Sequence, residues 1–179
     1  MLARTADGEN WSRPVKIAGT TPGTTEPQAS WGLPVVVRSG RIYIFYIREH
    51  KAHPEDRQVS GRFGVLYSDD NGHVWQSGPD LPVPRNRFDD PDPTVPKKFW
   101  FWTNAVRDSQ GRWLLGYTQV TSAKVRPRPA KEWPHADTRC AFARFENLDD
   151  VTDPADVEVS WLPTDREGLE VSNKMYPQI

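Results

Sequence analysis

The chain has 179 residues, with 23 Lys and Arg against 24 Asp and Glu and a net charge of −1. This balance argues against a nucleic-acid-binding or membrane-surface protein, since both usually carry a basic excess, and the length predicts one domain. No apolar run approaches the roughly 18 residues that a membrane span needs. The single cysteine, Cys140, excludes an intrachain disulfide and a cysteine metal cluster, and we expect it to be a structural thiol.

Short strands are the clearest elements in the first half of the chain. β-Branched and aromatic residues fill the segments 31–38, 41–48 and 62–67, and Trp75 begins a fourth candidate. Ser39-Gly40 separates the first two segments and predicts a two-residue hairpin turn. Four short antiparallel strands in succession are typical of one propeller blade or of one sheet in a sandwich.

The same order of strands recurs in the second half of the chain. The matching segments are 102–107, 112–120, 139–145 and 157–161. Gly111 follows Gly40 by 71 residues, and each glycine directly precedes the arginine that opens a strand. A fixed period of this kind is typical of a repeat architecture, here an all-β one. The frequent Pro and Gly residues argue against long helices, so we expect at most one helical turn.

The period also predicts how residues 1–179 divide into units. We expect the end of a preceding blade, two blades and the start of a further blade, at about 1–30, 31–98, 99–170 and 171–179. A closed propeller needs at least about four blades, so about two and a half four-stranded units predict part of a larger propeller. The alternative is a complete small sandwich.

Two turn motifs stand in register with these strands. Residues 68–75 read Ser-Asp-Asp-Asn-Gly-His-Val-Trp and fit the pattern Ser-x-Asp-x-Gly-x-x-Trp, and 5–11 form a shorter copy. In this pattern, the Asp can accept backbone N–H bonds within the turn, the Gly permits positive φ, and the Trp can pack back between strands. The motif residues are Asp7, Gly8 and Trp11 in the short copy, and Ser68, Asp70, Gly72 and Trp75 in the full one. A calcium loop at 69–71 would lack the spaced later ligands.

Residues 5–161 resemble the sialidase superfamily, whose Asp-box, or bacterial neuraminidase repeat, has this pattern. The resemblance implies an all-β, six-bladed propeller that acts on a glycan or other carbohydrate. In its full-length form the protein would be a glycoside hydrolase of the exo-sialidase kind, secreted or periplasmic, although no signal peptide is visible. Asp-boxes are structural turns in that family and lie away from the active site. The alternatives are a non-catalytic carbohydrate-binding propeller, a propeller polysaccharide lyase and a purely structural repeat.

The resemblance also implies site residues. Sialidases hold the substrate carboxylate with three arginines, and Gly32 stands where the first would be, which removes one ligand. Arg48 matches the second arginine, and Arg57 is a further substrate-binding candidate. Asp56 matches the acid/base residue, and its neighbour Glu55 could take that role instead. A solvated charged loop is the other interpretation of this segment. Because hairpin turns alternate between the two ends of a sheet, we expect Arg48 and Asp56 at the end opposite Asp70.

A second candidate cluster begins at Arg85 and precedes the aromatic run 99–102. In it, Asp89 and Asp90 are predicted to bind sugar hydroxyls, and a proline-rich surface loop is the alternative. His50 and His53 have no evident third ligand, so we predict no metal site. The sequence also has no phosphate-binding glycine loop, and we expect no cofactor.

Overall fold

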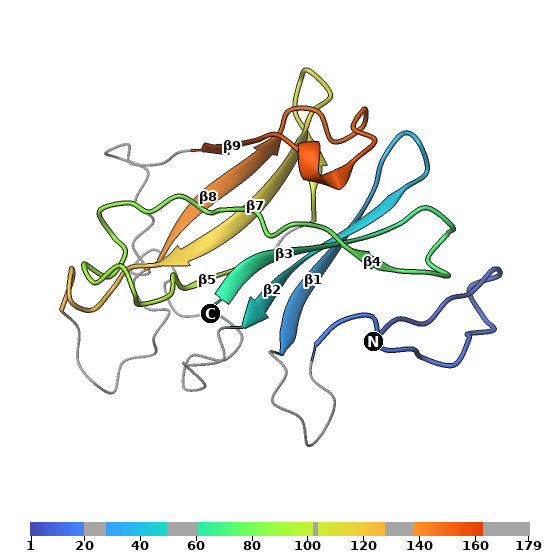
Figure 1. The fold of residues 1–179 in the computed structure, drawn as a ribbon, viewed down its shortest axis with the longest axis horizontal. Helices are drawn as coiled ribbons and strands as arrows, with labels where there is room; N and C mark the ends of the chain where they lie inside the picture. Colours follow the sequence, from blue (N-terminus) through green and yellow to red (C-terminus); the bar gives the residue numbers. More distant parts are fainter. Residues whose placement is uncertain (20–27, 50–60, 102–103, 128–137, 163–179) are drawn as a thin grey trace, which may run out of the picture.

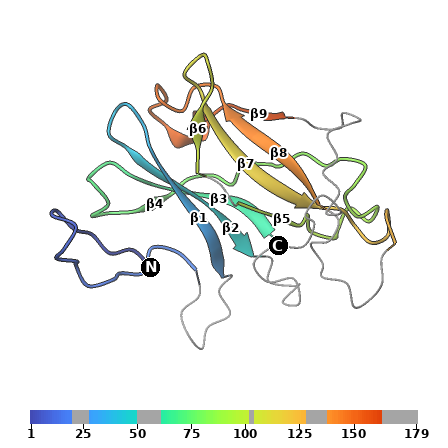
Figure 2. The same ribbon diagram turned by 180° about the vertical axis from the view of Figure 1, so that it is seen from behind.

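The computed structural model describes residues 1–19, 28–49, 61–101, 104–127 and 138–162, which form two antiparallel β-sheets. The two sheets lie one against the other, and the N-terminal segment runs along the outer side of the first (Figures 1 and 2). Among the described residues the one helical element is the single turn η2, Pro154–Asp156. The all-β prediction is therefore confirmed. No helix in this part of the chain is long and apolar enough to cross a membrane.

The first sheet is a meander of four strands in chain order. They are β1 (Ala29–Val36), β2 (Ile42–Glu49), β3 (Gly61–Ser68) and β4 (Gln76–Ser77). Successive side chains of a strand point to opposite faces, so Leu33 and Val35 are buried while Val36 is exposed. In β1 the pairing with β2 shifts at Trp31 and Gly32, where Trp31 takes a positive φ of 56°. Gly32, predicted to replace an arginine, lies in this bulge.

The second sheet repeats the arrangement with an interrupted first strand. Its strands are β5 (Phe99–Trp100), β6 (Val106–Arg107), β7 (Trp113–Val120), β8 (Thr138–Phe145) and β9 (Val159–Leu162). Both β5 and β6 pair with β7, one near each of its ends (Figure 2). Gly40 and Gly111 occupy the same turn in the two sheets and have φ values of 90° and 80°. The predicted recurrence of antiparallel strands is confirmed, but the first strand of the second set, predicted at 102–107, is observed as the two short strands β5 and β6.

The core lies between the facing sides of the two sheets. Phe45 of β2 is 1% exposed, and its ring centroid lies 4.7 Å from that of Phe145 in β8. Phe63 of β3 is fully buried and meets Phe101 at 4.7 Å and Trp161 at 5.7 Å, both edge to face. Aromatic pairs in this geometry add to the gain from burying their surface. Strands far apart in sequence are therefore joined chiefly by aromatic rings.

The turn that follows β3 is held by its own side chains. The Ser68 hydroxyl donates to the Asp70 carboxylate at 2.8 Å and accepts the Gly72 N–H at 2.9 Å. The Asp70 carboxylate also accepts the backbone N–H of Val74 at 2.8 Å. These bonds to the charged form lower the pKa of Asp70 from its ordinary value, with the Val74 N–H as the largest cause. The predicted hairpin turn between β3 and the strand after Trp75 is confirmed.

Residues 5–11 form the same kind of turn on the surface. Thr5 Oγ1 accepts the Gly8 N–H at 2.8 Å, and Asp7 accepts the backbone N–H groups of Glu9 and Asn10 at 2.9 and 2.8 Å. The Asn10 side-chain amide also donates to Asp7, and these bonds keep the pKa of Asp7 far below its ordinary value. The short copy of the motif therefore closes its turn in the way that the full copy does.

The expectation that both tryptophans pack back between strands is wrong for the short copy and only partly right for the full one. Trp11 is 62% exposed. Trp75 is half-buried, and its Nε1 donates to the Gly72 carbonyl at 3.0 Å within its own turn. Cys140, expected as a structural thiol, is exposed because its neighbour Ala141 takes the inward position of β8. Alternation along a strand decides which of two adjacent residues is buried.

The first testable prediction concerns the buried Ser68 hydroxyl in the turn that follows β3. Replacing Ser68, which is fully buried, by Ala leaves the Gly72 N–H without its acceptor, so we expect a loss of about 1–3 kcal/mol in the free energy of unfolding. Thr5→Ala removes the equivalent bond where water can replace it, and we expect a change within about 0.5 kcal/mol. Urea unfolding of both variants measures the difference. Equal losses would contradict the role given to burial.

Candidate functional site

The end of the first sheet opposite the Asp70 turn gathers charged side chains. Ile42 pairs with Ser68 at one end of β2 and β3, whereas Arg48 pairs with Arg62 and Glu49 with Gly61 at the other. The prediction that Arg48 lies at the end opposite Asp70 is therefore confirmed. Asp56 and Arg57, with Glu55, His50 and His53, lie outside the described residues.

Arg48 and Arg62 share one carboxylate at this end. Asp80, which follows β4, forms an ion pair with Arg48 and lies 3.4 Å from the Arg62 guanidinium. The ion pair with Asp80 raises the pKa of Arg48 above its ordinary value. The ion pair therefore takes up part of the Arg48 guanidinium, which has five N–H donors in all. The structure therefore gives Arg48 a partner that the sequence analysis did not foresee.

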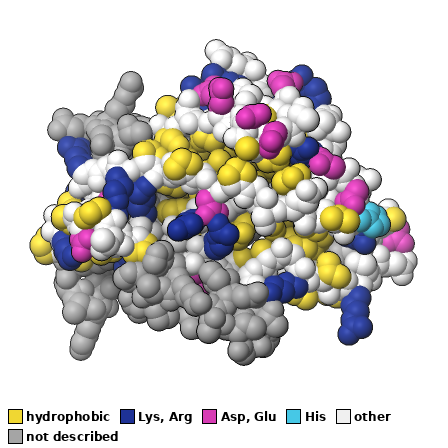
Figure 3. Space-filling view, in the orientation of Figure 1, with side chains coloured by type: hydrophobic (Ala, Val, Ile, Leu, Met, Phe, Trp, Pro, Cys, Tyr) yellow, Lys and Arg dark blue, Asp and Glu magenta, His cyan; other side chains and the backbone are white. Residues whose placement is uncertain are grey.

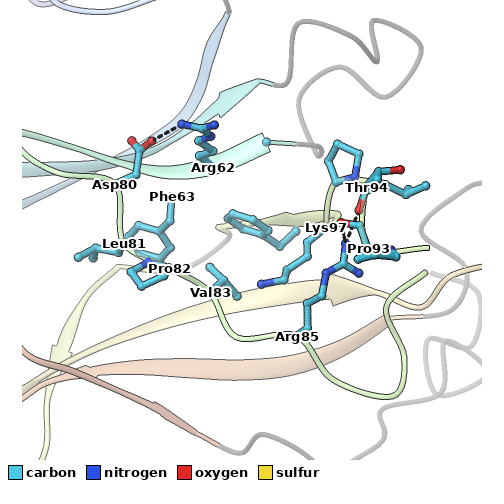
Figure 4. Close-up of a pocket in the computed structure, with 14 residues that line it drawn as sticks. Arg62, Phe63, Asp80, Leu81, Pro82, Val83, Arg85, Pro93, Thr94 and Lys97 are labelled. Carbon is cyan, nitrogen blue, oxygen red and sulfur yellow. Dashed lines mark hydrogen bonds and ion pairs between the residues drawn. The ribbon is translucent and has the colours of Figure 1, made fainter. Parts of the chain in front are cut away.

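Beside Asp80 lies a cleft of about 450 Å³, between the start of β3 and the long segment that links the two sheets. Arg62, Asp80, Arg85 and Lys97 bring charge to it, and Leu81, Pro82, Val83, Pro93 and Phe99 are among its apolar walls. Figure 4 shows Arg62 and Asp80 joined at one side of the cleft and Lys97 extending from the 93–97 segment toward Val83. In the space-filling view, Lys and Arg side chains gather beside an acidic side chain near the middle of the face (Figure 3).

Arg85 fixes one wall of this cleft. Its guanidinium donates to three backbone carbonyls of the segment that precedes β5, those of Asp90 at 3.0 Å, Pro93 at 2.9 Å and Val95 at 2.5 Å. A planar guanidinium with five N–H donors suits such a multiple contact. Arg85 therefore shapes the proline-rich wall.

Asp89 and Asp90, the predicted sugar ligands, do not line this cleft. Asp89 is 6% exposed, and its carboxylate accepts the Asn86 N–H at 2.9 Å and the Gln119 side-chain amide at 2.6 Å. Asp90 forms an ion pair with Lys124 at 2.9 Å and accepts the Ser122 hydroxyl at 3.1 Å. Both line a smaller cleft of about 230 Å³. Their bonds hold the linking segment against the second sheet, a structural role for Asp89 in particular.

Lys97 lies where the two clefts meet, since it lines both. Burial lowers the pKa of its ammonium below the ordinary value, and Arg85 adds to this while Asp89 opposes it. Sequence reasoning missed Asp80, Arg62 and Lys97 because their chain neighbourhoods are unremarkable. The one available signal was the length of the segment 78–98, since long segments on a rigid β scaffold are where function tends to lie.

Metal binding finds no support in the part of the chain that the structure describes. It contains no group of three or more His, Cys, Asp or Glu side chains that could hold an ion. The charged residues of the larger cleft are one carboxylate among cations, whereas metal sites in proteins gather carboxylates, imidazoles or thiolates. The chemistry of this cleft suits a polar organic ligand.

Comparison with known proteins adds no family to these observations. No family model matches the chain, and no curated protein matches it either. The likeness to sialidases therefore depends on the turn motif and the repeat of strands, and the function must be argued from the geometry of the cleft.

Proposed function

We propose that the protein is a glycan-acting module of the sialidase-like propeller kind, and that the cleft beside Asp80 receives the sugar. The observation that carries this proposal is the composition of the cleft, in which apolar walls stand beside a pair formed by Asp80 and Arg62. A sugar ring presents apolar C–H faces and a rim of hydroxyl groups. Apolar walls with a few placed polar groups are the usual means of binding such a molecule.

The arrangement of the sheets supports the propeller part of the proposal. A four-stranded and a five-stranded antiparallel sheet follow each other in chain order and pack face to face through the Phe45 and Phe145 rings. Successive blades of a propeller have this relation, because each sheet buries both faces against its neighbours. The Asp70 turn lies at one end of the first sheet and the Asp80 cleft at the other, as the sialidase likeness implies for structural turns and a site.

Binding without chemistry is the activity that the described residues support best. Among the described residues that line the cleft, Asp80 is the one carboxylate, and two arginines already hold it. Glycoside hydrolysis needs a second carboxylate, or a Tyr nucleophile in the sialidase scheme. The described part of the cleft therefore has the polar groups of a binding site but lacks a catalytic pair.

Hydrolysis is the second candidate, favoured by where β2 ends and β3 begins. Glu49 and Gly61 are paired at this end of the sheet, and Gly61 lines the cleft. Glu49 and Gly61 are the described residues on either side of the segment that carries Asp56, so the chain positions that flank this segment lie at the cleft end of the sheet. If Asp56 acts as the acid, Asp56→Asn lowers the turnover of a fluorogenic sialoside by at least about 100-fold and leaves sugar binding intact. Absence of turnover in the unaltered protein would leave the binding module as its function.

Binding is tested by titrating ¹⁵N-labelled protein with glucose, galactose, glucuronic acid and sialic acid, followed by NMR. We expect shifts confined to cleft residues such as Gly61, Leu81 and Thr94. Asp80→Asn should weaken the affinity for the bound sugar by about tenfold, the size of one hydrogen bond to a charged group. Asp69→Asn is the matched control, because Asp69 also pairs with an arginine, Arg41 at 2.5 Å, but at the other end of the sheet.

Two outcomes would contradict the proposal. The first is that none of the four sugars shifts the NMR signals of the cleft residues. The second is that Asp80→Asn and Asp69→Asn weaken the sugar affinity equally. Because Asp80→Asn also releases Arg48, a second variant keeps the test valid if the first is unstable. Arg62→Gln alters a side chain that is 69% exposed, so we expect the fold to tolerate it and the sugar affinity to fall.

A further inference from the structure

The cleft beside Asp80 carries more positive than negative charge. Its described lining includes Arg62, Arg85 and Lys97 against the single carboxylate of Asp80, which Arg48 also contacts. Asp89, a carboxylate whose charge acts on Lys97, is 6% exposed and accepts a hydrogen bond from Gln119, and it does not line this cleft. A ligand that fits this excess must bring negative charge of its own.

The three cations are not equivalent. Arg85 is committed to three backbone carbonyls, and Arg62, which is 69% exposed, has Asp80 as its ion-pair partner at 3.4 Å. Lys97 makes no hydrogen bond or ion pair with any other described residue, although it is half-buried. A desolvated ammonium without a counter-charge is unfavourable, and an anionic ligand would offset that cost. Among the described residues that line the cleft, Lys97 is therefore the cation whose charge neither an ion pair nor a hydrogen bond offsets.

We propose that the ligand of the cleft is an anionic saccharide and that its carboxylate or sulfate is bound by the Lys97 ammonium. The proposal rests on the proposed function and goes further, because it names the chemical class of the sugar and the residue that selects it. The apolar walls at Pro82 and Val83 would take the ring, while Lys97 extends toward Val83 in the same space (Figure 4). Selection through one lysine differs from the arginine triad that the sialidase likeness implies.

The proposal also predicts how the affinity depends on pH. Arg85 and Asp89 act on the Lys97 ammonium with opposite signs, the Arg62–Asp80 pair lies across the cleft, and burial lowers the lysine pKa. A bound anion favours the charged ammonium, so binding is accompanied by proton uptake once the pH approaches the lowered pKa. The affinity should therefore fall with rising pH earlier than it would for a solvent-exposed lysine.

The experiment compares charged and neutral partners of the same sugar by calorimetry. The pairs are glucuronic acid with glucose and galactose 6-sulfate with galactose, and inorganic sulfate alone serves as the anion without a ring. We expect at least one charged sugar to bind at least about tenfold more tightly than its neutral partner, and more tightly than sulfate, because one charge-assisted bond is added to contacts with the ring. Lys97→Met should abolish the preference and Lys97→Arg should retain most of it.

Lys98→Met is the matched control, since it removes the same charge one residue away and Lys98 is not part of the larger cleft. We expect it to leave the preference for the charged sugar unchanged. Lys97→Met should also raise the melting temperature of the ligand-free protein, because it removes a half-buried charge. A purely structural lysine would instead lower the melting temperature when replaced.

The outcomes separate this inference from the proposed function. Binding of neutral and charged sugars with equal affinity, or an undiminished preference in Lys97→Met, would overturn the role of Lys97 and leave the glycan site standing. Sulfate bound as tightly as the charged sugars would show an anion site without sugar recognition. If none of the sugars binds, both proposals fail together.

Discussion

Replacing Phe45 by alanine should lower the free energy of unfolding by about 3–5 kcal/mol, the usual cost of removing a buried aromatic ring from a core. The ring is 1% exposed and lies 4.7 Å from Phe145, 5.8 Å from Phe63 and 5.9 Å from Tyr43. Its loss leaves a cavity where β2 meets β8, so the contact between the two sheets is weakened together with each sheet. Urea unfolding followed by tryptophan fluorescence measures the change.

Phe142→Ala provides the matched control for this substitution. Phe142 lies in β8, only three residues before Phe145, but it is 42% exposed because it points away from the first sheet. We expect its replacement to cost less than about 1 kcal/mol. A loss as large as that of Phe45→Ala would show that the outward side of β8 is as important to stability as the side that faces β2.

Replacing Asp149 by alanine should cost about 2–4 kcal/mol, because this carboxylate joins the two sheets at the end that carries the Gly40 and Gly111 turns. It accepts two bonds from the Arg107 guanidinium at 2.5 and 3.0 Å and the backbone N–H of Arg38 at 2.9 Å. Trp113 Nε1 also donates to it, at 3.3 Å. Removal leaves these donors, one of them charged, without their acceptor.

Asp150→Ala is the control for the Asp149 variant. Asp150 lies 3.9 Å from Arg38, and both side chains are about three-quarters exposed, so this ion pair should contribute less than about 0.5 kcal/mol. The two variants change the same charge at adjacent positions. Equal effects in urea unfolding would contradict the bridging role of Asp149.

The Asp149 contacts also predict a pH dependence. The bonds from Arg107 are the largest cause that lowers the pKa of Asp149 from 3.8 to about 2. A lowered pKa stabilises the folded state at pH values above about 4, the pKa of the carboxyl in the unfolded chain. This stabilisation is lost as the pH falls through about 2, the pKa in the folded state. At 1.36 kcal/mol per unit, and after a reduction for solvent screening, it amounts to about 1–2 kcal/mol. The gap in unfolding free energy between the unaltered protein and Asp149→Ala should therefore narrow between about pH 4 and pH 2.

The strands and turns followed from the sequence because their causes are local. The run of β-branched and aromatic residues in 42–47 favours a strand, and Asn71-Gly72 can take the positive φ values of 58° and 79° that the turn needs. The 71-residue repeat predicted that a second sheet would copy the first, and the turns at Gly40 and Gly111 confirm it. Each of these features is fixed by residues within a few positions of one another.

The tertiary structure alone decided which side chains meet. Arg48 is in the predicted place but pairs with Asp80, 32 residues further on, and Asp89 is buried against Gln119, 30 residues further on. Trp11 and Cys140, both expected to pack, lie exposed on outer surfaces. The cleft with Lys97 exists because β3 and the segment before β5 lie side by side once the sheets pack. Such pairings depend on the distance between chain segments after folding, and composition and periodicity carry no information about that distance.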